Sequence, residues 1–251
     1  MKALFRYCGN KGRLLKFYRK PPPGTRRIVE PYLGSGAFSL NFDFPILGID
    51  ADPNVVELWN WLKTVSEEDL HMLGVLVERE RTQNPKFDIR SLDIPRGAQL
   101  YLKVNICGLV VGQWSSWSIY PQHTLPTKKT LESLRKAQET EVLQGDASLY
   151  FEHQRPGDLV FLDPPYLNTR ANYKRELEYD PKSTLVLLEG VSEPVIFTYG
   201  DGAPNIFPGL PWERLVERRV PNFRNGGTVN RTEYVCFLNW PRESDSISMF
   251  R

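Results

Sequence analysis

The sequence predicts an α/β fold, a doubly wound Rossmann-like parallel sheet that carries a mostly helical insertion. Apolar runs of strand length lie at 27–30 and 46–50, and a helix-like pattern follows the second. A glycine turn follows the first run, and an acid ends the second. This rhythm stops near residue 66, and apolar strand-like runs return only after residue 140. These observations indicate a parallel sheet interrupted by one long insertion.

The first 65 residues contain the opening elements of that sheet. Pro21-Pro22-Pro23-Gly24 ends a basic, helix-like segment, because consecutive prolines cannot continue a helix. Val55, Leu58, Trp59 and Leu62 recur at helical spacing. The expected elements, in order, are a helix at 11–20, a strand at 27–30, a glycine turn at 31–36, a helix from Ala37, a strand at 46–50 and a helix at 54–64.

Residues 66–140 are expected to form an insertion or subdomain, because no strand of the parallel type occurs there. They are mostly helical in pattern, with a stretch rich in tryptophan, serine and glycine at 108–123. Residues 1–65 and 141–251 would then make up the α/β domain. Its later strands are expected at 141–144, 159–162, 194–199, 214–220 and 234–240, with a helix around 185–188.

Composition excludes several classes of protein. The chain has 251 residues, of which 41% are hydrophobic and 25% charged, so it is not wholly disordered. No apolar run approaches the ~20 residues that span a bilayer, and the start of the chain lacks a secretory signal. The three cysteines are far apart and the three histidines lack metal-ligand spacing. We therefore expect a cytoplasmic protein without a metal.

Positive charge is concentrated at the N-terminus. Residues 1–29 contain nine basic residues and no acid, although the whole chain carries a net charge of only +2. A local basic surface can meet phosphates even when the total charge is near zero. The alternative is a solvated basic helix without a partner.

The sharpest chemical motif is Asp163-Pro164-Pro165-Tyr166, which directly follows the apolar run 159–162. Ligands of open α/β sheets bind beyond the carboxyl ends of the strands. The Asp163 carboxylate and the Pro164 carbonyl can both accept hydrogen bonds from one amino group, while Tyr166 stacks on the ring that bears it. This arrangement suits methyl transfer to an exocyclic amine, whose lone pair must be freed from the ring. The alternative is an ordinary proline turn with a capping aspartate.

A second motif is the glycine turn from Glu30 to Gly36, followed by Asp50 at the end of the next strand. Glycines let the backbone approach a ligand closely, and an acid in this place can accept hydrogen bonds from ribose hydroxyls. The NAD fingerprint requires a third glycine where Ser39 stands, and the P-loop lysine is absent. An ordinary glycine turn of an α/β protein remains the alternative.

Together these motifs resemble those of the Dam-type (D12 class) DNA adenine-N6 methyltransferases. Their order is similar to that of the family: an aromatic-x-Gly-x-Lys element, the glycine turn, an acidic second strand, Asp-Pro-Pro-Tyr and a late loop. The matching segments are Tyr7–Lys11, Val29–Gly36, Asp50–Asp52 with Leu58–Asn60, Asp163–Tyr166 and Arg224–Thr228.

The resemblance implies a Rossmann-like methyltransferase that uses S-adenosylmethionine, with residues 1–65 and 141–251 as its catalytic domain and residues 66–140 as its target-recognition subdomain. On matching positions, Tyr7, Lys11, Gly34, Gly36, Asp50 and Asp163 would contact the cofactor. Asp163, Pro164 and Tyr166 would act on an adenine flipped out of double-stranded DNA. Asp52 competes with Asp50 for the ribose, and Asp50 is favoured because it lies nearer the strand end. Nucleic-acid contacts are expected from Arg13, Lys16, Gln113, Arg224 and Asn225.

Three functional hypotheses remain open from the sequence. The first is an active DNA adenine methyltransferase of a bacterial, archaeal or phage-infected cell, either solitary or partnered with a restriction endonuclease or a phage. The second is an enzyme of the same fold that acts on RNA or on cytosine. The third is a catalytically silent nucleic-acid-binding partner, against which the intact Asp163 and Tyr166 argue. Trp114, Trp117 and Tyr120 recur at spacing three and suit either a helical core or a base-wedging surface.

Overall fold

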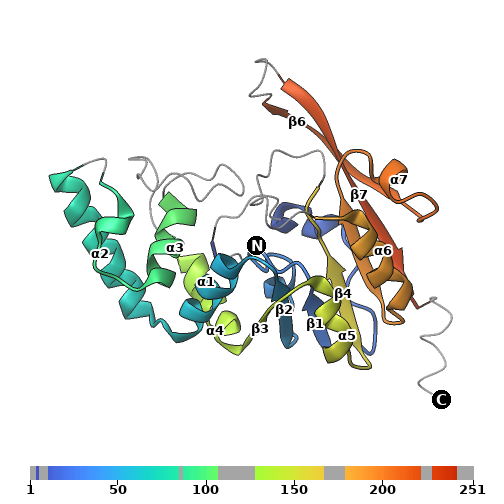
Figure 1. The fold of residues 1–251 in the computed structure, drawn as a ribbon, viewed down its shortest axis with the longest axis horizontal. Coiled ribbons are helices and arrows are strands. Elements are labelled where there is room, and N and C mark those ends of the chain that lie inside the picture. Colours follow the sequence, from blue (N-terminus) through green and yellow to red (C-terminus); the bar gives the residue numbers. More distant parts are fainter. Residues whose placement is uncertain are drawn as a thin grey trace.

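A twisted seven-stranded sheet forms the centre of the protein, as shown by a computed structural model that describes residues 4–5, 11–84, 87–106, 128–166, 179–221 and 228–241 (Figure 1). The strand order is β3-β2-β1-β4-β5-β7-β6. The strands are β1 (Arg27–Glu30), β2 (Ile46–Asp50), β3 (Glu141–Gln144), β4 (Asp158–Leu162), β5 (Val195–Tyr199), β6 (Glu213–Pro221) and β7 (Thr228–Leu238).

The first five strands run parallel, whereas β7 pairs antiparallel with β5 and β6 antiparallel with β7. The chain places β2 and β3 on one side of β1, and β4 and β5 on the other. The strand order therefore reverses between β1 and β4, and ligands of doubly wound sheets bind at such a switch point. This topology confirms the predicted fold class.

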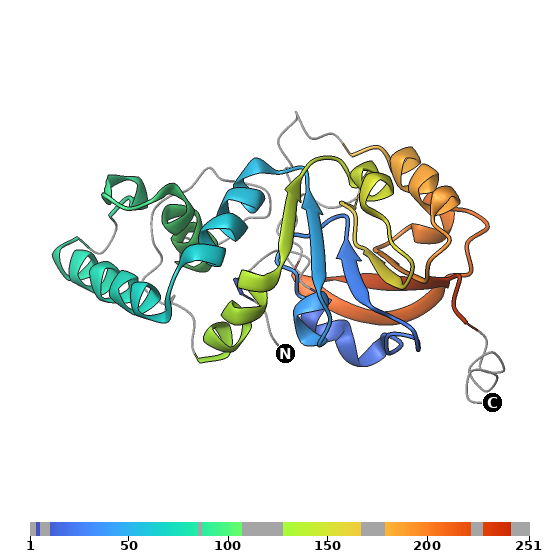
Figure 2. The same cartoon turned by 90° about the horizontal axis from the view of Figure 1, so that it is seen from below.

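The helical segments cover both faces of the sheet and extend from its β3 edge (Figure 2). The α-helices are α1 (Pro53–Thr64), α2 (Glu67–Gln83), α3 (Arg96–Ile106), α4 (Lys128–Glu139), α5 (Tyr150–His153), α6 (Pro181–Gly190) and α7 (Ala203–Ile206). The short 3₁₀ helices are η1 (Lys11–Phe17), η2 (Ser39–Asn41), η3 (Ile89–Ser91) and η4 (Ala147–Leu149). Among the helices that the structure describes, none has the length and apolarity to cross a bilayer.

Both faces of β1, β2, β4 and β5 are buried, which explains their largely apolar sequences, whereas the edge strand β3 is partly exposed. Val29 and Val160 pack on the face that carries α5, α6 and α7. Ile28 and Leu159 pack on the opposite face, against Leu14 of η1 and Phe38. Alternate residues of each strand therefore contribute to two different core clusters.

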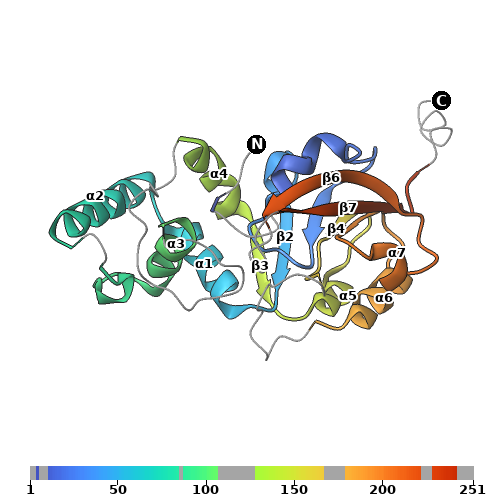
Figure 3. The same cartoon turned by 90° about the horizontal axis from the view of Figure 1, so that it is seen from above.

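Helices α2, α3 and α4 lie together beside α1, away from the sheet centre, as the two views in Figures 1 and 3 agree in showing. Their buried side chains form one continuous cluster with those of α1 and with Leu33 of the glycine turn. Gly97 lies so close to Trp61 of α1 that a Cβ there would be only 2.1 Å from the tryptophan Cβ. The inserted helices thus share a core with α1, and the division at residues 66 and 140 stays a prediction.

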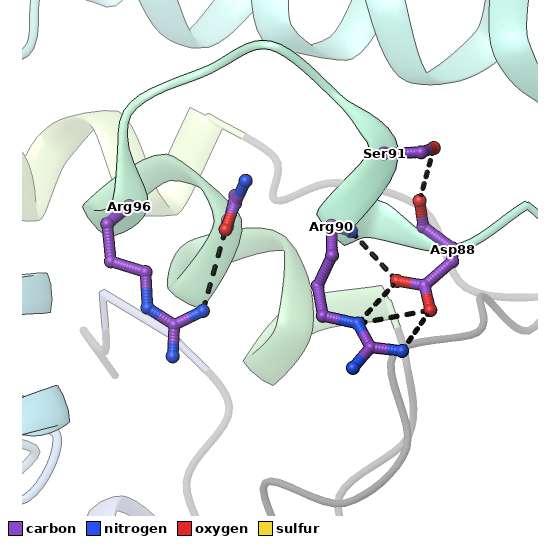
Figure 4. A network of polar contacts seen from close by, with 5 residues as sticks. Asp88, Arg90, Ser91 and Arg96 are labelled. Carbon is purple, nitrogen blue, oxygen red and sulfur yellow. Dashed lines mark hydrogen bonds and ion pairs between the residues drawn. The ribbon is translucent and has the colours of Figure 1, made fainter.

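The turn between α2 and α3 is held by a local polar network (Figure 4). Asp88 caps η3 by accepting a hydrogen bond from Arg90 N at 2.8 Å, and the Arg90 guanidinium lies 2.5 Å from Asp88 Oδ2. Hydrogen bonding from Arg90 holds the pKa of Asp88 below its ordinary value. These exposed contacts lie away from the sheet and serve to hold the turn.

Three expected elements differ in the structure. The segment predicted to be helical at 11–20 is a 3₁₀ helix that ends at Phe17, and the helix predicted from Ala37 is only the short η2. Strand β7 begins at Thr228, six residues before the predicted start. Its polar beginning is extended because it pairs along its length with β6, a nonlocal interaction that periodicity cannot reveal.

Candidate active site

Asp163 follows the last residue of β4, at the carboxyl edge of the sheet beside the switch point. Its carboxylate receives Lys11 Nζ at 2.7 Å from Oδ1 and 2.9 Å from Oδ2. Thr198 Oγ1 of β5 lies 3.0 Å from Asp163 Oδ1. Lys11 is 4% exposed and Asp163 20%, so the ion pair is largely shielded from water. Groups from two other segments, η1 and β5, therefore hold this carboxylate.

Tyr166 lies beside Asp163 and contacts the same lysine, Lys11. Its hydroxyl is 2.9 Å from Glu233 Oε2 and 3.2 Å from Asp163 Oδ1. Its ring packs on Tyr199 with centroids 4.7 Å apart, and Lys11 Nζ lies 4.7 Å from the ring centroid. Burial, together with the nearby carboxylates, raises the pKa of Tyr166 well above its ordinary value. The residue is thus a neutral aromatic surface whose orientation is fixed.

Gly200 makes room for that ring. A Cβ at this position would lie 2.6 Å from Tyr166 Cδ2, closer than carbon atoms can approach. Gly200 directly follows β5, so the backbone and the ring meet at the carboxyl edge of the sheet. Pro164, the third residue predicted to act in catalysis, is buried in the same turn.

The glycine turn lies at the end of the adjacent strand β1. Gly34 and Gly36 have φ angles of +47° and +59°, values that favour glycine. Trp59 Nε1 of α1 donates to Gly34 O at 2.8 Å, and a Cβ on Gly36 would lie 2.8 Å from the Trp59 ring. The helix after β2 therefore holds the turn in place.

Asp50 and Asp52 have different roles in the structure. Asp50 accepts hydrogen bonds from Gly34 N and from Asp52 N, both at 2.9 Å, which orients its carboxylate against the glycine turn. Burial raises the pKa of Asp50 to about 6. Asp52 instead caps α1 by accepting a hydrogen bond from Asn54 N at 2.9 Å. The helix cap accounts for Asp52, and this favours Asp50 as the ligand-binding acid.

Two acids of the site were missed by the sequence predictions. Glu30, at the end of β1, is 2% exposed and accepts a hydrogen bond from Ser39 N at 2.8 Å. Burial is the main cause that raises the pKa of Glu30 to about 8, and the negative charge of Asp163 adds to it. Its place at the end of a buried strand was a usable signal. Glu233, on β7, had no sequence motif around it.

The predicted nucleic-acid residues are only partly described. Arg13 and Lys16 are exposed on η1, the segment that begins with Lys11. Arg19, from the same basic segment, pairs with Glu213 at 2.9 Å and packs over the rings of Phe237 and Trp240. Tyr7, Gln113, Arg224, Asn225 and the stretch 108–123 with its tryptophans lie outside the described residues.

No group of three or more His, Cys, Asp or Glu side chains that could hold a metal occurs within the described part of the chain. The pairing of Asp163 with Lys11, and of Asp50 with backbone N–H groups, uses carboxylates as hydrogen-bond acceptors. These hydrogen bonds orient the carboxylates of Asp163 and Asp50.

Comparison with curated proteins identifies relatives of one kind. The chain is 24% identical over 228 residues to the retron Ec67 DNA adenine methylase of Escherichia coli, with 80% of this chain and 78% of that protein covered. It is 25% identical to a DNA adenine methylase of Vibrio cholerae, covering 68% of each chain. A DNA N-6-adenine-methyltransferase of Escherichia phage P1 is 27% identical over 82% of this chain but only 30% of its own length. No protein-family model matches the chain.

The sheet order, the Asp163 turn at the switch point and these relatives define a methyltransferase of the Rossmann-like α/β class. Within that class, these relatives are DNA adenine methylases, which supports the resemblance to the Dam-type family that the motifs predicted.

Proposed function

We propose that this protein transfers a methyl group from S-adenosylmethionine to the exocyclic amino group of an adenine flipped out of double-stranded DNA. The observation that carries the proposal is the placement of Asp163 and Tyr166 at the switch point, where Lys11, Thr198 and Glu233 fix both side chains. The family of the relatives agrees with this chemistry.

The glycine turn and Asp50 fit the adenosine part of the cofactor. The positive φ angles of Gly34 and Gly36 bring bare backbone to the ligand side, and Asp50 is held by two backbone donors. A carboxylate oriented in this way can still accept hydrogen bonds from ribose hydroxyls, because each oxygen has two lone pairs. Lys11 suits the methionine carboxylate, and Tyr7 is added on the family resemblance alone. When bound, S-adenosylmethionine supplies an electrophilic methyl group.

Asp163 prepares the target nitrogen for attack. The adenine amino group is a poor nucleophile because its lone pair is delocalised into the ring. Hydrogen bonds from its two N–H groups to the Asp163 carboxylate and the Pro164 carbonyl favour a pyramidal nitrogen with a freer lone pair. No strong base is needed at the start of the reaction, and the contribution of the protein is mainly positioning and electrostatics.

Tyr166 provides the surface on which the flipped base rests. Extrusion from the duplex costs a few kcal/mol. Stacking of the base on the fixed Tyr166 ring returns about 1–3 kcal/mol. The ring is held by Tyr199 and by the Glu233 hydrogen bond, so little side-chain freedom is lost when the base arrives.

The remaining DNA contacts are divided between two kinds of surface. We assign phosphate contacts to Arg13 and Lys16, which are exposed on the segment that starts at Lys11. Gln113, Arg224 and Asn225 are assigned to DNA on the sequence alone, and residues 66–140 to the choice of target site. Such an enzyme would work in the cytoplasm of a bacterial, archaeal or phage-infected cell, either solitary or beside a restriction endonuclease.

A direct test is transfer of radiolabelled methyl groups from S-adenosylmethionine to plasmid DNA, with RNA as the competing substrate. We expect label in DNA with the parent protein and background label with Asp163→Ala. Label in RNA alone would overturn the assignment of the substrate, and equal labelling by the Asp163 variant would overturn the assignment of the site.

A further inference from the structure

We infer that Glu233 is a positioning residue that accepts the hydrogen bond of the Tyr166 hydroxyl and thereby keeps Asp163 available to accept from the target amine. This inference rests on the proposed function, because it concerns the same site. Glu233 matches none of the sequence motifs, and it reaches the site from β7, the antiparallel strand.

The Tyr166 hydroxyl can donate only one hydrogen bond, because a phenol has a single proton to donate. Two carboxylate oxygens lie within reach, Glu233 Oε2 at 2.9 Å and Asp163 Oδ1 at 3.2 Å. The hydroxyl can make a strong, linear hydrogen bond to only one of them at a time. The shorter distance favours Glu233 as the acceptor.

Asp163 has little capacity left to accept further hydrogen bonds at Oδ1. Its Oδ1 already lies 2.7 Å from Lys11 Nζ and 3.0 Å from Thr198 Oγ1. A carboxylate oxygen has about two lone-pair sites, so Lys11 and Thr198 already fill those of Oδ1. A Tyr166 hydroxyl turned toward Asp163 would therefore have to displace one of these donors or occupy Oδ2, where it would compete with the target amino group.

Glu233 is held rigidly in place. The residue is 7% exposed, and its strand is anchored immediately beside it. Thr232 N donates to Asp201 Oδ1 at 2.7 Å, and Arg231 Nη1 lies 3.2 Å from Asp201 Oδ2. Asp201 belongs to the turn that follows β5 and Gly200. Glu233, which accepts the hydrogen bond from Tyr166, is thus held by the same edge of the sheet that holds the Tyr166 ring.

The inference makes an unusual prediction about paired substitutions. Glu233→Ala should lower kcat about ten- to a hundredfold, the loss expected from one charge-assisted hydrogen bond, because Tyr166 then turns its proton to Asp163. Tyr166→Phe in the same chain removes that proton but keeps the ring. The double variant should therefore be more active than Glu233→Ala alone, approaching Tyr166→Phe. Glu233→Gln, whose amide oxygen still accepts, should stay within about threefold of the parent.

The experiment measures kcat, KM for DNA and affinity for S-adenosylmethionine in the parent, Glu233→Ala, Glu233→Gln, Tyr166→Phe and the double variant. The matched control is Glu217→Ala, which removes an exposed carboxylate paired with Arg214 on the adjacent strand and should leave kcat unchanged. KM and cofactor affinity should change little in all five proteins. Thermal unfolding shows that each variant is folded. If Glu233→Ala does not fold, Glu233→Asp replaces it, because the shorter side chain withdraws the acceptor from the hydroxyl.

A double variant no more active than Glu233→Ala would overturn the inference, as would a Glu233→Gln variant as inactive as the alanine variant. A Glu233→Ala variant with parental kcat would also overturn it. A parent protein that methylates no DNA adenine would instead refute the proposed function, so the two failures are distinguishable.

Discussion

Lys11 Nζ lies 2.7 Å from Oδ1 and 2.9 Å from Oδ2 of Asp163, so residues 152 positions apart in the chain form an ion pair at the carboxyl edge of the sheet. Lys11 begins η1, and the same ammonium group lies 4.7 Å from the Tyr166 ring centroid. The N-terminal segment, the strand β4 and the aromatic surface therefore meet at one cation. This contact brings Lys11, the last residue of the motif at 7–11, against the first residue of the motif at 163–166.

Asp163→Ala should abolish methylation while the protein stays folded. The variant loses the acceptor for the target amine, and each preorganised group of this kind contributes on the order of 10²–10³ in rate. Measured kcat and a thermal unfolding curve check both parts of this prediction. Activity within tenfold of the parent would remove Asp163 from the reaction.

Asp158→Ala should have the opposite effect, with lower stability and little change in kcat. Asp158 lies at the other end of β4, is 1% exposed and receives Arg27 Nε and Nη2, each at 2.8 Å. Removing one partner of a buried ion pair costs about 3–5 kcal/mol, because the other charge stays buried. Denaturant unfolding measures the loss. A stability change below about 1 kcal/mol would contradict this reading of the pair.

Asp50→Ala should weaken the binding of S-adenosylmethionine about ten- to a hundredfold, the effect of losing hydrogen bonds from ribose to a charged acceptor. The matched control is Asp52→Ala, which removes the N-cap of α1 and should lower stability by about 0.5–2 kcal/mol with little effect on affinity. Titration calorimetry separates the two. Equal losses of affinity in both variants would show that Asp50 is not the particular ribose contact.

The stability of the protein should fall as pH rises, through the buried carboxyl of Glu30. Because its pKa rises from 4.5 in the unfolded chain to about 8 in the folded protein, the folded state binds the proton more tightly. The stabilising contribution is complete below about pH 4.5 and is lost as pH rises through about 8.

Glu30→Gln should therefore flatten this fall, because the amide oxygen keeps the hydrogen bond from Ser39 N without a charge. Thermal unfolding of the parent and the variant at pH 5 and pH 8.5 gives the comparison. The variant should gain stability relative to the parent at the higher pH. A constant difference between the two proteins across this range would show that Glu30 does not titrate there.

Neutralising Arg13 and Lys16 together should weaken DNA binding on all sequences alike and reduce its dependence on salt. Each phosphate contact contributes about 0.9 to the slope of log affinity against log salt, so the slope should fall by about two. Arg19→Gln is the matched control, because Arg19 already pairs with Glu213 beside Phe237. If the control reduces the slope as much as the double variant does, the phosphate surface is not on η1.

The parallel part of the fold was predictable because its strands are local apolar runs, each followed by a turn with a recognisable sequence. The boundaries at 27–30, 46–50 and 141–144 are those of the structure. The start of β7 was not predictable, since Asn230, Arg231 and Thr232 become extended only by pairing with β6. The helix expected from Ala37 shrinks to η2, where Ser39 N donates to Glu30.

The site could be predicted where the chemistry lies within one short motif. Asp163 and Tyr166 are three residues apart, and their contact is local. Glu233 lies 67 residues from Tyr166, and only the antiparallel pairing of β5 with β7 brings the two together. The capping role of Asp52 likewise needed the structure, because sequence spacing alone cannot distinguish a helix cap from a ligand-binding acid.

The central claim is tested most directly by mass spectrometry of nucleosides from DNA incubated with the protein and S-adenosylmethionine whose methyl group carries deuterium. The proposed function predicts deuterated N6-methyladenine in DNA treated with the parent protein, and none in DNA treated with Asp163→Ala. Deuterated methylcytosine in place of methyladenine, or equal methyladenine with both proteins, would contradict it.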